Sequence, residues 1–303
     1  MFIENATSGS QSIAISQGSG ANVTIATGKT AVVYLDGAGS GAAVVDAMAG
    51  VDPGVTDTLA EVLVAGSVTG GTDLSISIGD DFKTLTAGTS NFRAGVNAGN
   101  SITSGGNYNV VVGDEAGTAL TTGDNNVAVG YGALDAEDTG IGSVAIGYNA
   151  LTAQNNDAIN YNVAVGTIAG AAVTTGTQNS LIGYGAGIAL TDADFNTVLG
   201  TNALATDTLG SKSTAIGTQA LATQNFTSAT DSFNTAIGYQ TGLNLTTGIK
   251  NTLIGGLAGD SLTDADYNTV VGYGSGGQLT TGSYNVALGM ATLAATTTQS
   301  NNT

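Results

Sequence analysis

The chain carries acidic residues in pairs, but it has no histidine and no cysteine. Two pairs are adjacent in sequence, Asp114-Glu115 and Glu137-Asp138. Two carboxylates are enough to hydrolyse a glycosidic bond, whereas Ser-His-Asp and Cys-His sites need residues that this chain lacks. Neither pair has aromatic residues placed around it to line a sugar-binding groove. We therefore predict that the protein is not an enzyme.

A second acidic pattern occurs twice, as Thr-Asp-Ala-Asp at 191–194 and at 263–266. Carboxylates two residues apart can share a calcium ion. The nine-residue pattern of calcium-binding β-rolls is absent, and zinc sites lose their usual His and Cys ligands. We expect these aspartates to form solvated turns, and we predict no metal and no cofactor.

These residues lie within a repeat built on the motif Asn-Val-Ala-Val-Gly, here numbered p1 to p5. The motif occurs eleven times, and eight of the ten intervals between its glycines are 17 residues, the others being 19 and 21. The p5 glycines are Gly113, Gly130, Gly147, Gly166, Gly183, Gly200, Gly217, Gly238, Gly255, Gly272 and Gly289. Self-similarity at a fixed short period indicates a stack of structural repeats.

Each motif position has a physical interpretation. Position p4 is always a large aliphatic residue, and it shares a strand face with p2 because strand side chains alternate. Position p3 is apolar throughout, so we expect both faces of the strand to be covered. Position p1 is Asn in all motifs except two with Ser (Ser143 and Ser213), which predicts a hydrogen-bonded ladder of stacked amides. The p5 glycine permits a positive φ where the strand ends.

A period of 17 residues is too short for a pair of helices and suits one coil of a β-helix or β-roll with two or three short strands. We therefore predict an all-β fold in which a small N-terminal β-rich module precedes an eleven-coil solenoid. At about 4.8 Å per coil, the rod would be about 50 Å long. A chain with 47 glycines and 5% aromatic residues makes thin layers, so we expect partner copies to complete the core, as a homotrimer.

The net charge of −18 is expected to repel nucleic-acid phosphates and anionic lipids, so neither is a predicted partner. The start, at residues 1–6, lacks the basic and apolar regions of a signal peptide, and no apolar run is long enough to span a membrane. We expect synthesis in the cytoplasm, without membrane insertion.

The chain divides into three predicted parts: a β-rich module at 1–55, a junction segment at 56–106 and a β-helical rod at 107–303. In the first part, strands are predicted at 12–16, 22–25 and 29–35, and the run at 42–48 could be helix or strand. In the second, a short helix at 58–66 is followed by strands.

Two segments of these first parts resemble tail-fibre proteins of tailed bacteriophages, especially marine ones. They are LAEVLVAGSVTGGTDLSISIGDD at 59–81 and GKTAVVYLDGAGSGAAVVDA at 28–47. The resemblance covers about 80 residues. It implies a virion scaffold and names no receptor.

The repeats also resemble the Asn-Ser-Val-Ala-Ile-Gly coils of trimeric autotransporter adhesin heads, which are trimeric β-rolls with shorter coils. A bacterial adhesin would need an export signal and a membrane anchor, and neither is evident in a chain that ends with TTTQSNNT. The phage interpretation is therefore favoured. It implies a structural virion protein, a tail fibre or spike that projects from the particle and adsorbs to the host surface.

Partners would then be other copies of the chain, other tail or capsid proteins, and a host glycan or protein receptor. Two alternatives remain, a polysaccharide-cleaving tailspike and a fibre that decorates the capsid. Insertions in solenoids bulge outward and often bind partners. The two long coils therefore supply candidate receptor contacts, Asn155, Asn156, Asp157, Asn225, Phe226 and Thr227.

Aromatic residues recur immediately before p1 and immediately after p5. Six coils have Tyr or Phe before p1, and five have Tyr after p5. Such rings could stack on carbohydrate, or they could pack between coils and between chains. Because they recur with the repeat, packing is the favoured interpretation.

Overall fold

The computed structural model describes residues 2–4, 12–15, 23–27, 30–35, 44–46, 87–293 and 297–302. The chain forms two compact units, Met1–Ile78 and Gly79–Thr303. The described residues form strands, turns and bends and contain no α-helix. The helix expected at 58–66 lies outside the described residues.

The first unit consists of short antiparallel strands. β1 (Phe2–Glu4), β4 (Thr30–Leu35) and β5 (Val44–Asp46) form one sheet with β4 in the centre, and β2 (Ile13–Ile15) pairs with β3 (Val23–Ile25). Three of these strands fall where alternation predicts them, and the ambiguous run at 42–48 contributes a strand. The expected β-rich module is therefore confirmed.

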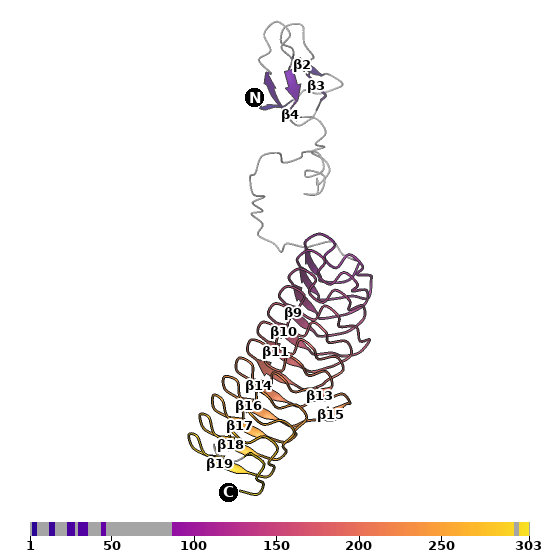
Figure 1. The fold of residues 1–303 in the computed structure, drawn as a ribbon. Helices are drawn as coiled ribbons and strands as arrows, with labels where there is room; N and C mark the ends of the chain where they lie inside the picture. The colour runs from indigo at the N-terminus through magenta and orange to yellow at the C-terminus, as the bar shows by residue number, and fades with distance from the viewer. Residues whose placement is uncertain are drawn as a thin grey trace. The chain divides into compact units, whose positions relative to one another are not determined.

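The second unit is a solenoid with one parallel sheet of twelve strands, stacked in sequence order (Figure 1). Each strand is three residues long and is formed by p2, p3 and p4 of one motif. The strands are β6 (Phe92–Ala94), β7 (Val110–Val112), β8 (Val127–Val129), β9 (Val144–Ile146), β10 (Val163–Val165), β11 (Ser180–Ile182), β12 (Thr197–Leu199), β14 (Thr214–Ile216), β16 (Thr235–Ile237), β17 (Thr252–Ile254), β18 (Thr269–Val271) and β19 (Val286–Leu288).

The register of this sheet follows the motif without a slip. Val129 pairs with Ile146, and Ile146 pairs with Val165 across the 19-residue interval. The pairing also continues across the 21-residue interval, where Ile216 pairs with Ile237. Long intervals therefore enlarge a corner and leave the strands aligned, which confirms the predicted stack.

The solenoid has one coil more than the eleven expected, and it begins before residue 107. The additional strand is β6, which pairs in register with β7. Its motif, Asn91-Phe92-Arg93-Ala94-Gly95, was not recognised because Arg93 replaces the small apolar residue at p3 and Ala94 replaces the large aliphatic residue at p4.

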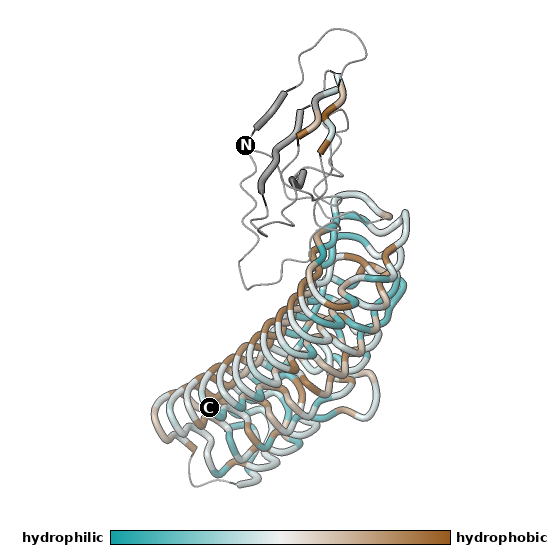
Figure 2. Tube along the Cα trace, turned by 90° about the horizontal axis from the view of Figure 1, so that it is seen from above, coloured by the Kyte–Doolittle hydropathy of each residue, from teal (hydrophilic) through white to brown (hydrophobic). Residues whose placement is uncertain are grey.

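Each coil contributes one strand to the large sheet, instead of the two or three expected. Within 87–293 the only further pairing is β13 (Gly210–Ser211) with β15 (Thr230–Asp231) and an isolated parallel bridge between Ile141 and Ile159. The remaining corners are turns, and many of them use residues with positive φ. Hydrophobic segments recur at the same place in successive coils (Figure 2).

The p5 glycine ends every strand with φ between 117° and 143°. A Cβ on Gly183 would lie 2.7 Å from the carbonyl oxygen of Gly200, the p5 glycine of the next coil. This contact is too close for a side chain, so glycine is required both for the positive φ and for the close approach of adjacent coils.

Candidate functional site

The outward side of the large sheet is formed by p2 and p4, and we call it the outer face. From β7 to β19 the p3 side chains point inward and are at most 2% exposed, whereas the p2 and p4 residues of all twelve strands are half-buried or exposed. Among them, Ile182 is 40% exposed, Leu199 46% and Leu288 64%. The expectation that both faces are covered is therefore wrong for a single chain, because the thin core is filled by p3 and by corner leucines and has no room for p2 and p4.

The outer face has no charged residue in any coil, although the chain has a net charge of −18. Its p2 column is Val in β7 to β10, Ser180 in β11, Thr from β12 to β18 and Val286 in β19. Its p4 column is Val, Ile or Leu from β7 onward. Acidic residues are confined to corners and to the interior. The outer face is thus an uncharged strip along the solenoid, with an aliphatic p4 column from β7 onward and a p2 column that is Ser or Thr from β11 to β18.

The p1 residues form the predicted ladder inside the coil. The Asn109 carboxamide oxygen accepts a hydrogen bond of 2.9 Å from the backbone N–H of Asn126, and Asn91 does the same for Asn109. The side-chain amide of Asn126 also donates to the carbonyl of Gly140, 14 residues later. Each p1 Asn therefore connects its coil to the next, and all of them except Asn268 also close their own coil through the side-chain amide.

The interior of each coil is filled in one of two ways. Position p9, four residues after p5, has positive φ in every coil and is either Leu or Gly. Where p9 is Gly, p12 is a buried aliphatic residue, as with Gly117 and Leu120. A Cβ on Gly117 would lie 2.7 Å from Leu120 Cδ1, so both arrangements place a leucine in the same space. These leucines lie in turns or directly after them and belong to no second strand.

Where p9 is Leu, p12 is buried and polar in the described coils. Such coils occur as two adjacent pairs, and p12 is acidic in the first coil of each pair and Gln in the second. The p12 residues are Glu137 with Gln154, and Asp207 with Gln224, all fully buried. The second coil of each pair begins with Ser at p1 and contains the insertion.

The first pair forms a buried network around Gln154. Its side-chain amide donates to Glu137 Oε2 at 2.9 Å and to Ser143 Oγ at 2.8 Å, and its carboxamide oxygen accepts from Asn162. Glu137 also accepts from the Gly140 backbone and from Asn160. Gln154 thus takes the place of the asparagine that is missing at Ser143 and continues the ladder.

The second pair repeats this network around Gln224. Its amide donates to Asp207 Oδ2 at 2.6 Å and to Ser213 Oγ at 2.9 Å, and its carboxamide oxygen accepts from Asn234. Asp207 Oδ1 accepts from the backbone N–H groups of Gly210 and Phe226. These buried polar residues are not among those predicted from the sequence. The available signal is that Ser replaces Asn at p1 in both long coils.

The networks fix the bases of the two inserted corners. In the first, Asn155, Asp157, Ala158 and Ile159 are exposed and Asn156 is half-buried. In the second, Thr227, Ser228 and Ala229 are exposed and Asn225 is half-buried. Phe226 is 5% exposed and packs against Gly210, so it is a core residue and not a receptor contact. The sequence gives no sign that this aromatic residue of the inserted corner points inward.

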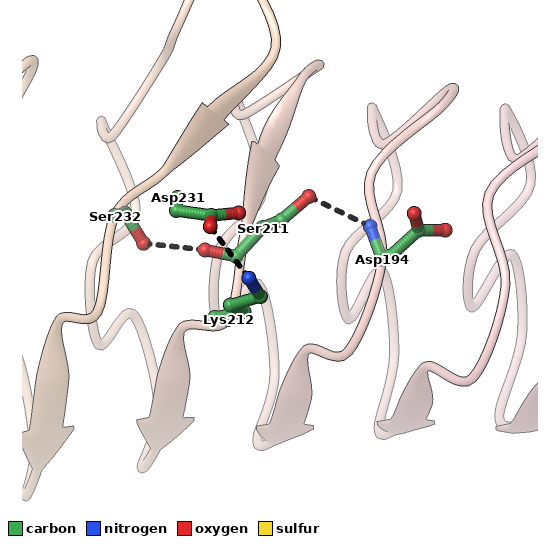
Figure 3. A network of polar contacts seen from close by, with 5 residues as sticks. All are labelled: Asp194, Ser211, Lys212, Asp231 and Ser232. Carbon is green, nitrogen blue, oxygen red and sulfur yellow. Dashed lines mark hydrogen bonds and ion pairs between the residues drawn. The ribbon is translucent and has the colours of Figure 1, made fainter.

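The second inserted corner projects from the stack at β13 and β15 (Figure 1). Polar contacts between neighbouring coils hold its base (Figure 3). Lys212 forms an ion pair with Asp231, and Ser232 Oγ donates to the carbonyl of Ser211. Ser211 Oγ in turn accepts from the backbone N–H of Asp194. Three successive coils are connected in this way.

Exposed aromatic residues form two columns along the solenoid. In the column before p1, Tyr267 and Tyr284 stack with centroids 4.8 Å apart, and in the column after p5, Tyr131 and Tyr148 stack at 5.5 Å. Lys250 Nζ lies 4.9 Å from the Tyr267 ring centroid. The faces of these rings are covered by their neighbours, which supports packing between coils for them.

The carboxylates considered for catalysis and for calcium binding accept hydrogen bonds within the solenoid. Glu137 is buried in the network above, and burial raises its pKa. Asp114 accepts a backbone hydrogen bond from Val96, and Glu115 accepts one from the Asn97 side chain. Asp192 and Asp194 accept hydrogen bonds from Thr175 and Thr177 of the preceding coil. Within the part of the chain that the structure describes, no three acidic residues are grouped as metal ligands.

Comparisons of the chain with protein-family models, with curated proteins and with solved structures found no match. Among the residues described, none belongs to a helix with the length and apolar character needed to cross a bilayer.

Proposed function

We propose that the protein is a structural fibre or spike of a bacteriophage virion, whose solenoid projects from the particle and adsorbs to the host surface. The support is twofold. The segments at 28–47 and 59–81 resemble phage tail fibres, and the solenoid is a regular rod of stacked coils. Such a rod can hold a receptor-binding surface at a fixed distance from the particle.

The outer face is the main observation that supports this proposal, because it provides a surface on which copies of the chain can assemble. A row of twelve strands is about 53 Å long and a three-residue strand about 10 Å wide, so the strands alone present roughly 500 Å². A standard interface buries about 800 Å² per partner. Exposed aromatic residues, before p1 in six coils and after p5 in five, widen the strip toward that value.

Three parallel copies with their outer faces toward a common axis make a fibre that buries this strip and leaves the acidic corners in water. Burial of apolar area stabilises such an assembly by about 25 cal/mol per Å². Because the outer face is uncharged, no charge has to be desolvated when the copies meet. The net charge of each chain then keeps fibres apart.

The first experiment measures the mass of the full chain by light scattering and its position by immunogold labelling of intact particles. We expect three times the chain mass of 29.5 kDa, and gold particles on the tail. Label on the head would show the capsid-fibre alternative. A stable monomer, or particles without label, would contradict the proposal.

The tailspike alternative is tested separately, by incubation of the purified protein with host envelope polysaccharide and assay of reducing ends. We expect none to be released. Release of oligosaccharides that persists after repeated purification would replace the structural proposal with an enzymatic one.

A further inference from the structure

The two inserted corners are alike in more than their length. Each insertion lies in the second coil of a pair and follows a buried Gln at p12. Each is also followed, after one buried residue, by an exposed aromatic ring, Tyr161 in the first coil and Phe233 in the second. The same buried acid, Gln and Ser accompany both insertions. These corners are therefore built features of the repeat.

We propose that each inserted corner and its aromatic residue form a subsite for an uncharged glycan: residues 155–159 with Tyr161, and residues 227–231 with Phe233. The inference rests on the proposed function and names the class of receptor. Both subsites occupy the same place in the repeat and are four coils apart, which corresponds to about 19 Å along the rod. One extended glycan chain lying along this edge can reach both.

The side chains at these corners match the chemistry of a sugar. Tyr161 is 57% exposed and Phe233 48% exposed, and an aromatic ring offers a surface for the C–H face of a pyranose. Asn155 and Asp157 at the first corner, and Thr227 and Ser228 at the second, are exposed groups that can hydrogen-bond hydroxyls. Apolar stacking combined with short polar groups suits a polyhydroxylated ligand.

At the position before p1, the coil that precedes each ring has a non-aromatic residue, Gly142 or Lys212. The Tyr161 ring occupies the space that a side chain at Gly142 would need, since a Cβ there would lie 2.6 Å from Tyr161 Cδ1. The Phe233 ring lies beneath Lys212, whose Nζ is 5.2 Å from the centroid. Both rings are thus held in position by the preceding coil.

The corners are also fixed before any ligand arrives. The Thr139 hydroxyl donates to Asp157 Oδ1 at 2.7 Å, and Asn156 donates to the carbonyl of Thr175. At the second corner, the β13–β15 pair and the Lys212–Asp231 ion pair hold the base (Figure 3). Preorganised side chains lose less entropy on binding, so weak polar contacts can give useful affinity.

The charge around the subsites favours an uncharged glycan over an acidic one. Asp157 is exposed at the first corner; at the second, Lys212 is paired with Asp231, and Lys250 of the following coil donates to the Tyr267 hydroxyl. A chain with a net charge of −18 repels a polyanion at long range. A protein receptor would instead be expected to use a large exposed apolar side chain, and Ile159 provides one at the first corner only.

The test uses affinity gel electrophoresis of the full chain in gels that contain laminarin, mannan or dextran, with alginate as the anionic comparison. We expect at least one neutral polysaccharide to retard the protein and alginate to have no effect. Tyr161→Ala and Phe233→Ala should each weaken binding several-fold, and the double variant by more than about tenfold, because two linked subsites reinforce each other. Tyr184→Ala, an exposed tyrosine in a coil without insertion, is the matched control.

Three outcomes would overturn the proposal: no retardation by any neutral polysaccharide, retardation by alginate alone, or unchanged binding by the double variant. Circular dichroism and light scattering of each variant confirm that the solenoid and its assembly are intact. Failure here leaves the mass and the immunogold result of the virion proposal unaffected, so the two can be judged independently.

Discussion

At the residue scale, the buried polar side chains define where the repeat departs from its pattern. An Asn at p1 satisfies its own coil and the next, and two Ser residues break this ladder. Gln154 and Gln224 restore it by reaching from p12 of the same coil. A buried polar group without partners costs about 1–3 kcal/mol, so these glutamines are expected to be essential to the long coils.

The first prediction concerns Gln154. Gln154→Ala removes one donor to the buried Glu137 carboxylate and leaves Ser143 and Asn162 with unpaired groups. We expect a loss of about 3 kcal/mol in the free energy of unfolding, measured by chemical denaturation. Gln178→Ala, at an exposed glutamine, should change stability by less than about 0.5 kcal/mol. Equal effects of the two variants would contradict the role assigned to the network.

The second prediction concerns the pH dependence that Glu137 contributes. Burial raises its pKa, so the folded state binds its proton more tightly than the unfolded state does. Stability from this group is then greatest at low pH and falls as pH rises from the ordinary glutamate pKa through the raised one. The Tm of the wild type minus the Tm of Glu137→Gln should therefore decrease as the pH rises from acidic to neutral. The difference for Gln178→Ala, at an exposed residue without a titrating group, should be the same at both pH values.

At the element scale, the coil is a turn-rich loop with one short strand, and its core has room for one leucine from either p9 or p12. This explains why the two types of coil alternate without disturbing the register of the sheet. The strand itself is placed by Asn at p1 and by the close approach of p5 glycines.

The third prediction tests this shared space. Leu120→Ala leaves a cavity and should cost roughly 2–5 kcal/mol. Gly117→Leu alone should also destabilise, because its side chain would overlap Leu120 Cδ1. The combined variant Gly117→Leu/Leu120→Ala reproduces the arrangement of the other coil type, so it should be more stable than the sum of the two losses implies. Chemical unfolding of all four proteins measures the coupling, and additive losses would argue against a shared space.

Much of this element could be predicted from the sequence, for reasons that the structure makes clear. The period, the strand at p2 to p4 and the p1 ladder follow from side chains that repeat, such as Val129, Ile146 and Val165. Which strand face points inward could have been predicted, because p3 is apolar in all eleven motifs whereas p2 is Ser or Thr in six of them. The first coil was missed because Arg93 breaks the pattern, and Phe226 was misplaced because an insertion need not point every residue outward.

At the scale of the whole solenoid, the outer face gives a flat uncharged surface, and the corners carry the charge. A single charge placed on this face would have to be buried in the proposed trimer. Such burial costs several kcal/mol when the charge has no partner.

The fourth prediction uses this cost. Ile182→Lys, near the middle of the outer face, should convert the proposed trimer to monomer, while the circular dichroism spectrum of the solenoid is retained. Ala229→Lys, at an exposed corner, adds the same charge and should leave the mass unchanged. Light scattering separates the two results. A trimer that survives Ile182→Lys would show that the outer face is not the contact between copies.

The pairing of acid and glutamine in neighbouring coils has a consequence for how such a gene can change in length. Recombination between repeats can add or remove a 17-residue unit and alter the span by one strand spacing. Loss of the coil that contains Gln154 would leave the buried carboxylate of Glu137 without the hydrogen bond from Gln154. Surviving length variants should therefore gain or lose these two coils together, whereas units with an aliphatic p12 can be duplicated one at a time.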